Sequence, residues 1–248
     1  MGLQRLFNNL APAVGLIAMA ALSGCGDNMN VEIDGDGVPL AELDMTGDPP
    51  TGVVLAGSDK LIITVGEEFE IEVTGTDEAR ARMRFARDGE TLAVHRSGNQ
   101  WGDSDIATVE ITLPQVDNIV IAGSGEVTAS GLASEASVVI SGSGSLETPE
   151  VASASLDVVI AGSGRYTASG TAERLSLNIA GSGAANLRGL SAERADVNTA
   201  GSGEAVFSSN GRVDANIIGS GTVRVVGSAR CEVNTVGSGR LVCEDADS

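Results

Sequence analysis

The feature that most constrains the fold is a Gly-Ser-Gly motif that occurs seven times in the second half of the chain. Successive central serines are separated by 19, 20, 19, 20, 18 and 18 residues. A repeat this short cannot bury a core alone, so each must pack its apolar side chains against its neighbours. The spacing therefore predicts a solenoid with one motif per coil. The seven serines are Ser124, Ser143, Ser163, Ser182, Ser202, Ser220 and Ser238.

Aligning the repeats on these serines shows which positions face inwards. The positions three, five and seven residues before the serine are almost all apolar or Thr, whereas the position six before is polar in every coil. A second, mostly apolar stripe lies three and five residues after the serine. Two strands per coil, joined by Gly-containing corners, predict a parallel β-helix whose strands pair one coil away. No His or Lys base accompanies the serines, so the pattern favours a structural corner over a nucleophile or a row of ligand-binding hydroxyls.

The N-terminal segment has the pattern of an export signal. Arg5 precedes an apolar run over residues 10–22, which is too short to span a membrane, and Leu22-Ser23-Gly24-Cys25 resembles a bacterial lipobox. We expect residues 1–24 to be a removed lipoprotein signal peptide and Cys25 to carry the lipid; the alternative is an ordinary signal peptide cut nearby. Gly26 after the cysteine favours the outer membrane.

Charge narrows the class of partner. The sequence has 15 basic and 34 acidic residues, and residues 26–50 contain seven acids and no base. So acidic a surface repels nucleic acid. We interpret residues 25–39 as an acidic linker and residues 40–248 as one domain, with repeats from about residue 108. The Asp34-Gly35-Asp36-Gly37 stretch lacks the full ligand set of a calcium loop, so no metal or other cofactor is expected.

A strand-rich segment leads into the repeats. Alternating patterns predict strands over residues 61–65, 69–73 and 80–85, and no window has a convincing helical period. The last of these contains a basic cluster, which either grips an acidic partner or the acidic linker, or forms an outward strand surface. His95 is interpreted as a surface strand residue, and Trp101, in the most loop-like stretch, either caps the core or stacks on a sugar. The basic cluster consists of Arg80, Arg82, Arg84 and Arg87.

The order of these motifs resembles a known family. Asp88-Gly89-Glu90-Thr91-Leu92 is followed by Val109-Glu110-Ile111-Thr112-Leu113-Pro114 and then by Ile119-Val120-Ile121-Ala122-Gly123-Ser124-Gly125 and its repeats. Over about residues 40–245 this is similar to the bacterial GIN-domain family of autotransporter adhesin heads. The resemblance implies an exported, right-handed β-helix and provides no catalytic residue to carry over.

Two features of the last coils go beyond that resemblance. Cys231 and Cys243 occupy inward columns, and in an exported chain they either form a disulfide or remain buried thiols. The outward positions eight, six and four before the serine carry Arg, an acid or Ser, and Asn, which predicts a polar lattice. Either the lattice is satisfied internally and keeps this face soluble, or it docks a repetitive partner such as a polysaccharide. The candidate lattice residues are Arg174, Asn178, Arg194, Asp196, Asn198, Arg212, Asp214, Asn216, Arg230, Glu232 and Asn234.

These observations predict a lipid-anchored protein of the cell envelope with a non-enzymatic adhesion or structural module. Its expected partners are the membrane, through the anchor, and either a glycan or another envelope protein. The open end of a β-helix also allows assembly with a second copy. The alternative is a β-helix that binds or degrades polysaccharide. Degradation requires long loops with clustered carboxylates or a basic residue, whereas these coils differ in length by only two residues.

Overall fold

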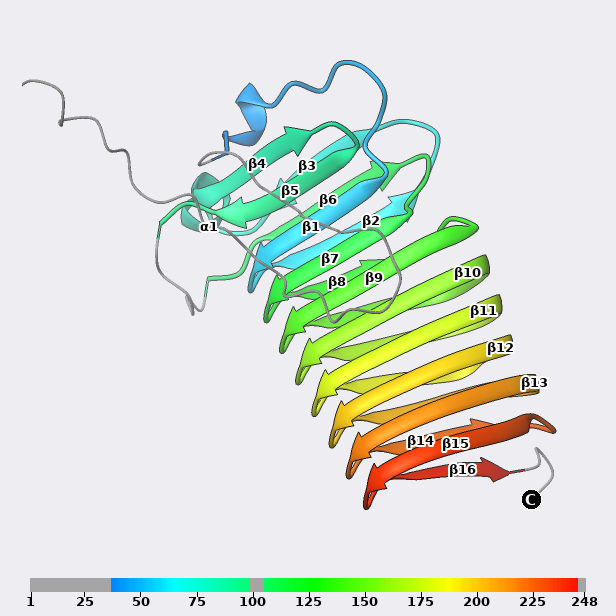
Figure 1. Ribbon diagram of the computed structural model, residues 1–248. Helices are drawn as coiled ribbons and strands as arrows, with labels where there is room; N and C mark the ends of the chain where they lie inside the picture. Colours follow the sequence, from blue (N-terminus) through cyan, green and yellow to red (C-terminus); the bar gives the residue numbers. More distant parts are fainter. Residues whose placement is uncertain (1–36, 99–104, 245–248) are drawn as a thin grey trace, which may run out of the picture.

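The computed structural model describes residues 37–98 and 105–244, which form a parallel β-solenoid (Figure 1). Strands make up 70% of the structure, and about seven turns of ~19 residues each are stacked. The β-helix predicted from the serine spacing is thus confirmed, whereas the right-handed sense stays a prediction.

The elements follow one another without long helices. One 3-10 turn (Leu40–Glu42) and one short helix, α1 (Asp77–Arg82), accompany the strands of the described chain. The strands are β1 (Gly52–Gly57), β2 (Lys60–Val65), β3 (Glu70–Thr74), β4 (Met83–Asp88), β5 (Thr91–Arg96), β6 (Thr108–Leu113), β7 (Asn118–Gly123), β8 (Glu126–Ala129), β9 (Glu135–Gly142), β10 (Ser145–Gly162), β11 (Arg165–Gly181), β12 (Ala184–Gly201), β13 (Glu204–Gly219), β14 (Thr222–Val226), β15 (Arg230–Gly237) and β16 (Arg240–Glu244).

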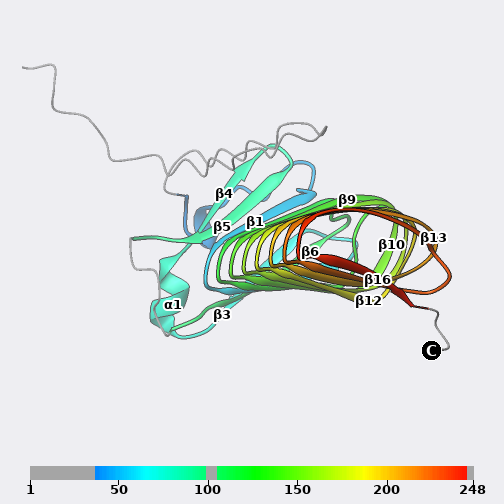
Figure 2. The ribbon, with the colours of Figure 1, turned by 60° about the horizontal axis from the view of Figure 1, so that its bottom comes forward.

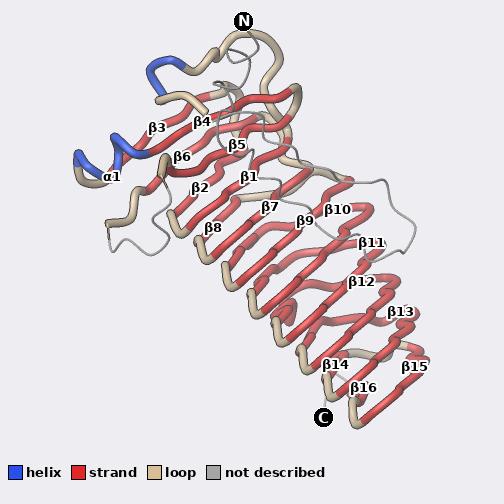
Figure 3. The backbone as a smooth tube through the Cα atoms, turned by 60° about the vertical axis from the view of Figure 1, so that its left-hand side comes forward, coloured by secondary structure: helices blue, strands red, loops and turns tan. Residues whose placement is uncertain are grey.

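Each coil contributes to two parallel faces, seen almost along the solenoid axis in Figure 2. The first face contains β5, β1, β7, β9, the second halves of β10 to β13, and β15; we call it the lattice face. The second contains β6, β2, β8, the first halves of β10 to β13, β14 and β16; we call it the groove face. The strands β10 to β13 run through both faces, because each turns from one into the other (Figure 3).

The Gly-Ser-Gly motifs form the corners at which the chain passes from the lattice face to the groove face. The first glycine of every motif has a positive φ, for example +117° at Gly181. A Cβ added there would lie 2.5 Å from the carbonyl oxygen of Gly162 one coil earlier. The Ser182 amide donates a hydrogen bond of 2.8 Å to that same oxygen, while the serine side chain faces solvent. The corner therefore needs Gly for both conformation and space.

The inward columns make one continuous core between the two faces. Side chains from Ile119 in the first Gly-Ser-Gly coil to Val225 near the last are almost fully buried. Tyr166 is the largest buried side chain, and its hydroxyl lies 2.8 Å from that of Thr148. The last coil is different: Val233, although in an inward column, is 48% exposed, because no further described strand covers it.

The N-terminal end of the stack is capped. β5 and β6 form its outermost coil, where β4 pairs antiparallel with β5 and β3 pairs antiparallel with β6. β1 and β2, although earlier in sequence, lie between this coil and the coil of β7 and β8. They meet at a Gly57-Ser58-Asp59 corner in which Asp replaces the second glycine. The lead-in therefore contains a true coil that lacks the Gly-Ser-Gly motif.

Asp59 joins this first true coil to the cap. Its buried carboxylate accepts hydrogen bonds from Arg96 Nε at 2.6 Å and Nη2 at 2.5 Å, and from the Ala107 amide at 2.8 Å. A two-point guanidinium contact plus a backbone donor satisfies most of the carboxylate's acceptor capacity. The buried pair thus fixes the end of β5 against the corner of the next coil.

The predicted strand over residues 80–85 is wrong in its first half. Residues up to Arg82 belong to helix α1, and β4 begins only at Met83. The Thr76 hydroxyl caps the helix by accepting a hydrogen bond from the Ala79 amide at 3.1 Å. Acids in the first turn and arginines in the last suit the helix dipole and form ion pairs along the helix. These end signals outweigh the alternation, and six residues are too few to show a helical period.

Candidate functional site

The predicted site residues form three groups: those outside the described residues, the two cysteines of the last coil, and the lattice residues. Cys25 and Trp101 lie outside the described residues, so their predicted roles stay predictions. Cys231 and Cys243 are joined by a disulfide with Cα atoms 6.8 Å apart, which links β15 to β16 in the final coil. Their columns face inwards, but Cys243 is exposed because the last coil has no described neighbour beyond it.

The candidate lattice residues come together on the lattice face. Pairing of β11, β12, β13 and β15 places their arginines in one row across the strands. A second row begins with Ser176 and continues with Asp196, Asp214 and Glu232. The asparagines make a third row, which continues towards the cap as Val159 in β10. This third row therefore changes from apolar to polar at β11, whereas the row of Asp196 is polar already at Asp157 in β10.

The asparagines bond one another from coil to coil. The Nδ2 group of Asn198 donates to Oδ1 of Asn178 at 3.1 Å, and Asn216 and Asn234 continue the ladder at 3.1 and 3.3 Å. Each bond joins two neighbouring strands, so Asn198 and Asn216 both donate and accept a side-chain hydrogen bond within the protein. This arrangement matches the internally satisfied lattice more closely than the docking surface.

Arg212 holds the charged part of the lattice together. Its guanidinium contacts Asp214 at 2.7 and 3.0 Å and Glu232 at 3.2 Å. The hydrogen bond from Arg212, followed by its charge, lowers the pKa of Asp214 below its ordinary value. The same bond raises the pKa of Arg212. Both groups stay ionised over the neutral range, so this pair behaves as a fixed surface element.

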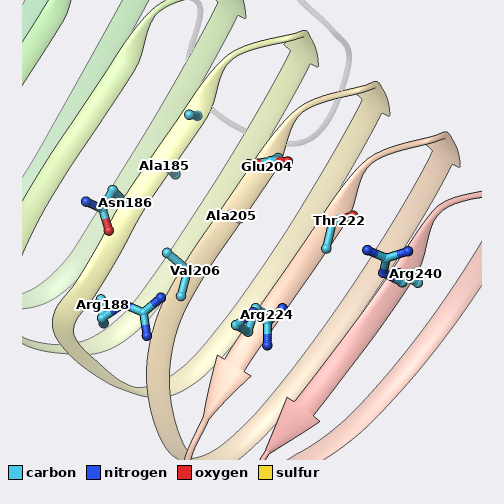
Figure 4. A pocket seen from close by; sticks show the side chains of 10 residues that line it. Ala185, Asn186, Arg188, Glu204, Ala205, Val206, Thr222, Arg224 and Arg240 are labelled. Carbon is cyan, nitrogen blue, oxygen red and sulfur yellow. The ribbon is translucent and has the colours of Figure 1, made fainter.

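The opposite sheet contains a hollow that the sequence analysis did not predict. It has a volume of about 310 Å³ and lies over β12, β13, β14 and β16 on the groove face (Figure 4). Its base is formed by short side chains, Ala184, Val206 and Thr222, between longer polar ones. We call it the arginine groove; its polar lining residues are Asn186, Arg188, Glu204, Thr222, Arg224 and Arg240.

Two arginines of the groove have unused guanidinium groups. Within the described chain, neither Arg188 nor Arg240 makes a side-chain hydrogen bond or ion pair, whereas Arg224 contacts Glu244 at 2.5 Å. Figure 4 shows Arg188 projecting towards Val206 and Arg240 projecting towards Thr222, so both turn into the groove. Strands β13 and β14 separate the two arginine-bearing strands. The groove thus has a free cationic group at each end.

The basic cluster of the lead-in is divided between several structural tasks. Arg80 and Arg82 pair with Asp77 and Glu78 along α1. Arg87 donates hydrogen bonds to backbone carbonyl oxygens of Thr46 and Asp48, and its guanidinium lies 5.8 Å from the ring centre of Phe69. Arg87 therefore holds the segment that precedes β1. This segment lies after the predicted acidic linker, which ends at residue 39.

Other chemical groups offer no competing site in the described chain. Residues 37–98 and 105–244 contain no group of three or more His, Cys, Asp or Glu side chains placed to hold a metal ion. His95 lies half-buried on β5 beside the cap, with Nδ1 3.2 Å from the Arg96 carbonyl oxygen. No helix in the described part of the chain is long and apolar enough to cross a membrane.

Short coils, glycine corners and solvent-facing polar rows define a β-solenoid domain. The chain belongs to the family described as "Putative auto-transporter adhesin, head GIN domain", whose model matches residues 49–229. The predicted family is thus confirmed. No curated protein compared with the chain matches it significantly.

Solved structures share this fold at low sequence identity. A putative adhesin from Bacteroides fragilis NCTC 9343 superposes with a TM-score of 0.73 at 19% identity, covering 81% of this chain and 94% of that one. A putative lipid binding protein from Parabacteroides distasonis ATCC 8503 has a TM-score of 0.64 at 20% identity, covering 79% and 93%. A putative adhesin from Parabacteroides merdae ATCC 43184 has a TM-score of 0.59 at 18% identity, covering 81% and 93%.

Proposed function

We propose that the chain is a lipid-anchored protein of the cell envelope, in the outer membrane, whose solenoid is a non-enzymatic adhesion module. Membership of an adhesin-head family supports an exported, surface-related role. The lipobox at Cys25 supports the anchor, and Gly26 after it supports the outer-membrane location.

The direction of the solenoid is the observation that carries the proposal. The described chain enters at the capped end, where Val38 bridges to Phe85 on β4. Cys25 lies only twelve residues before Gly37, so a lipid on it tethers the capped end. The coils then extend away from the cap to β15 and β16 (Figure 1). A module built in this way presents its last coils farthest from its anchor.

Charge supports the last coils as the contact region. Residues 165–244 contain eight of the fifteen basic residues but only seven of the thirty-four acidic ones, a net charge of +1 within a chain of net charge −19. The rest of the chain is strongly acidic. This asymmetry repels anions near the anchor and leaves the outer coils accessible to them.

The anchor is tested by expressing the full-length chain and its Cys25→Ser variant in a Gram-negative host. We expect the parent protein to enter the detergent phase and to be retained by the outer membrane, and the variant to be released as a soluble protein. Equal partitioning of the two forms would disprove lipidation at Cys25. Adhesion is tested on the same cells by their attachment to glycan-coated surfaces, with cells that carry an empty vector as the reference.

A further inference from the structure

We propose that the arginine groove binds an acidic polysaccharide through carboxylate groups on different sugar residues of one chain. The inference names the ligand class of the adhesion module proposed above and rests on that function. It concerns the groove face, whereas the candidate lattice lies on the opposite sheet.

The unused donors of the groove indicate an anionic ligand. An arginine guanidinium has five N–H donors in a planar fork that matches a carboxylate at two points. Arg188 and Arg240 present such forks without a partner in the described chain, and they project into the hollow. Arg224 is bonded to Glu244, which largely neutralises its charge, so the two free arginines are the main cationic groups of the groove.

The positions of the two free arginines require more than one negative charge on the ligand. Arg188 lies on β12 and Arg240 on β16, with β13 and β14 between them. Arg240 is in register with Ala184, four residues before Arg188 on β12. Three strand spacings and this offset along the strands together place the two backbones about 20 Å apart. A single carboxylate cannot bond both forks at once, whereas a chain of acidic sugars lying diagonally across the groove offers one charge at each end.

The remaining lining residues distinguish a sugar acid from a denser polyanion. Glu204 makes no side-chain hydrogen bond or ion pair in the described chain, and with Asn186 and Thr222 it offers acceptors and donors for sugar hydroxyls. The same carboxylate repels a heavily sulfated or phosphorylated chain. A volume of about 310 Å³ is at the lower end of the range for small-ligand sites, about 300–1,000 Å³, so it fits a short segment of a polymer.

The lattice face provides a matched control. Arg174 and Arg230 also lack a side-chain partner in the described chain, and they lie on the other sheet of the same coils. The double variant R174Q/R230Q removes the same charge as R188Q/R240Q without altering the groove. Because none of these four side chains makes a hydrogen bond or ion pair within the described protein, both variants are expected to keep the melting temperature of the parent.

The test is titration calorimetry of the full-length protein in neutral detergent with oligogalacturonate, with dextran sulfate and neutral dextran as the other probes. We expect oligogalacturonate to bind, more weakly as salt rises, and R188Q/R240Q to weaken binding about tenfold or more because charged hydrogen bonds are lost. The R174Q/R230Q variant should bind as the parent does.

Four results would overturn the proposal. They are no binding of oligogalacturonate, tighter binding of dextran sulfate, equal binding of neutral dextran, and equal weakening by both double variants. The measurement uses purified protein, so its failure is distinguishable from a failure of anchoring or of cell adhesion, which are measured on cells.

Discussion

At the scale of single residues, the core has one position where polarity conflicts with its surroundings. Thr199 stacks between Ile179 and Ile217 in an inward column, and its buried Oγ1 has no hydrogen-bond partner in the described chain. Burial of an unpaired hydroxyl costs about 1–3 kcal/mol. The position therefore lowers the stability of the middle coils.

Replacement of Thr199 by Val should increase the free energy of unfolding by about 1 kcal/mol, because the methyl group keeps the volume and removes the unpaired hydroxyl. Urea unfolding followed by circular dichroism measures the change. Thr235 occupies the same column but is exposed in the last coil, so Thr235→Val serves as a control and should change stability little. Equal effects of the two substitutions would show that burial of the hydroxyl is not the cause.

Tyr166 gives the core a defined sensitivity to alkaline pH. Burial raises its pKa to about 12, partly opposed by the hydrogen bond with Thr148. The unfolded chain ionises its tyrosine near pH 10. Stability is therefore unaffected by this group below pH 10 and falls by about 2–3 kcal/mol as the pH rises to 12, because only the unfolded state loses the proton in that interval.

Since Tyr166 is the only tyrosine, tyrosinate absorbance follows this single group. We expect the folded protein to titrate well above pH 10 and the urea midpoint to decrease over the same range. A Tyr166→Phe variant should lack this part of the pH dependence. Titration of the native protein at the ordinary tyrosine pKa would contradict the burial of the hydroxyl.

At the scale of elements, the corners should be the least tolerant part of a coil. Gly181→Ala forces a positive φ on Ala and places its Cβ against the Gly162 carbonyl. We expect a loss of about 2–4 kcal/mol, measured by thermal unfolding, because strain and displacement of a backbone oxygen combine. Gly131, whose added Cβ would meet its nearest atom at 3.5 Å, is the control, and Gly131→Ala should be nearly neutral. Comparable losses at both sites would refute the corner argument.

The disulfide should stabilise the final coil selectively. The two cysteines are twelve residues apart in the sequence. Closing a loop of this length lowers the chain entropy of the unfolded state, which stabilises the folded state by about 3 kcal/mol. In a solenoid each coil contacts only its neighbours, so the effect should stay local. In the Cys231→Ser/Cys243→Ser double variant, amide hydrogen exchange should accelerate over residues 230–244 and remain slow in β10 to β12. Uniform acceleration along the chain would argue against a local role.

How well each element was predicted depends on whether its signal repeats. The inward columns and the registered rows of Arg, acid and Asn are visible in the sequence because each recurs once per coil. Helix α1 and the coil of β1 and β2 were not predicted because the signal for each occurs only once. At the corner between β1 and β2, Asp59 stands where the repeated motif has its second glycine. The arginine groove was missed because it joins unlike residues from four strands: the short Ala184 and Thr222 create its depth, and no period links Arg188 to Arg240.

At the scale of the whole molecule, the solenoid has two different ends. The cap of β3, β4 and α1 covers the end nearest the tether, whereas β15 and β16 end the described stack with the inward-column residue Val233 48% exposed. The proposed anchor at Cys25 and the proposed groove in the last coils then lie at opposite ends. Adhesion in this account depends on outward side chains of the outer coils and not on the glycine corners.

Attachment of whole cells to a polygalacturonate-coated surface tests whether the arginine groove in the last coils mediates adhesion. Cells that make the full-length parent protein, R188Q/R240Q or R174Q/R230Q at equal levels are compared with cells that carry an empty vector. The account predicts strong attachment for the parent and R174Q/R230Q, and attachment near the empty-vector level for R188Q/R240Q. No gain in attachment by the parent, or an equal loss in both double variants, would contradict it.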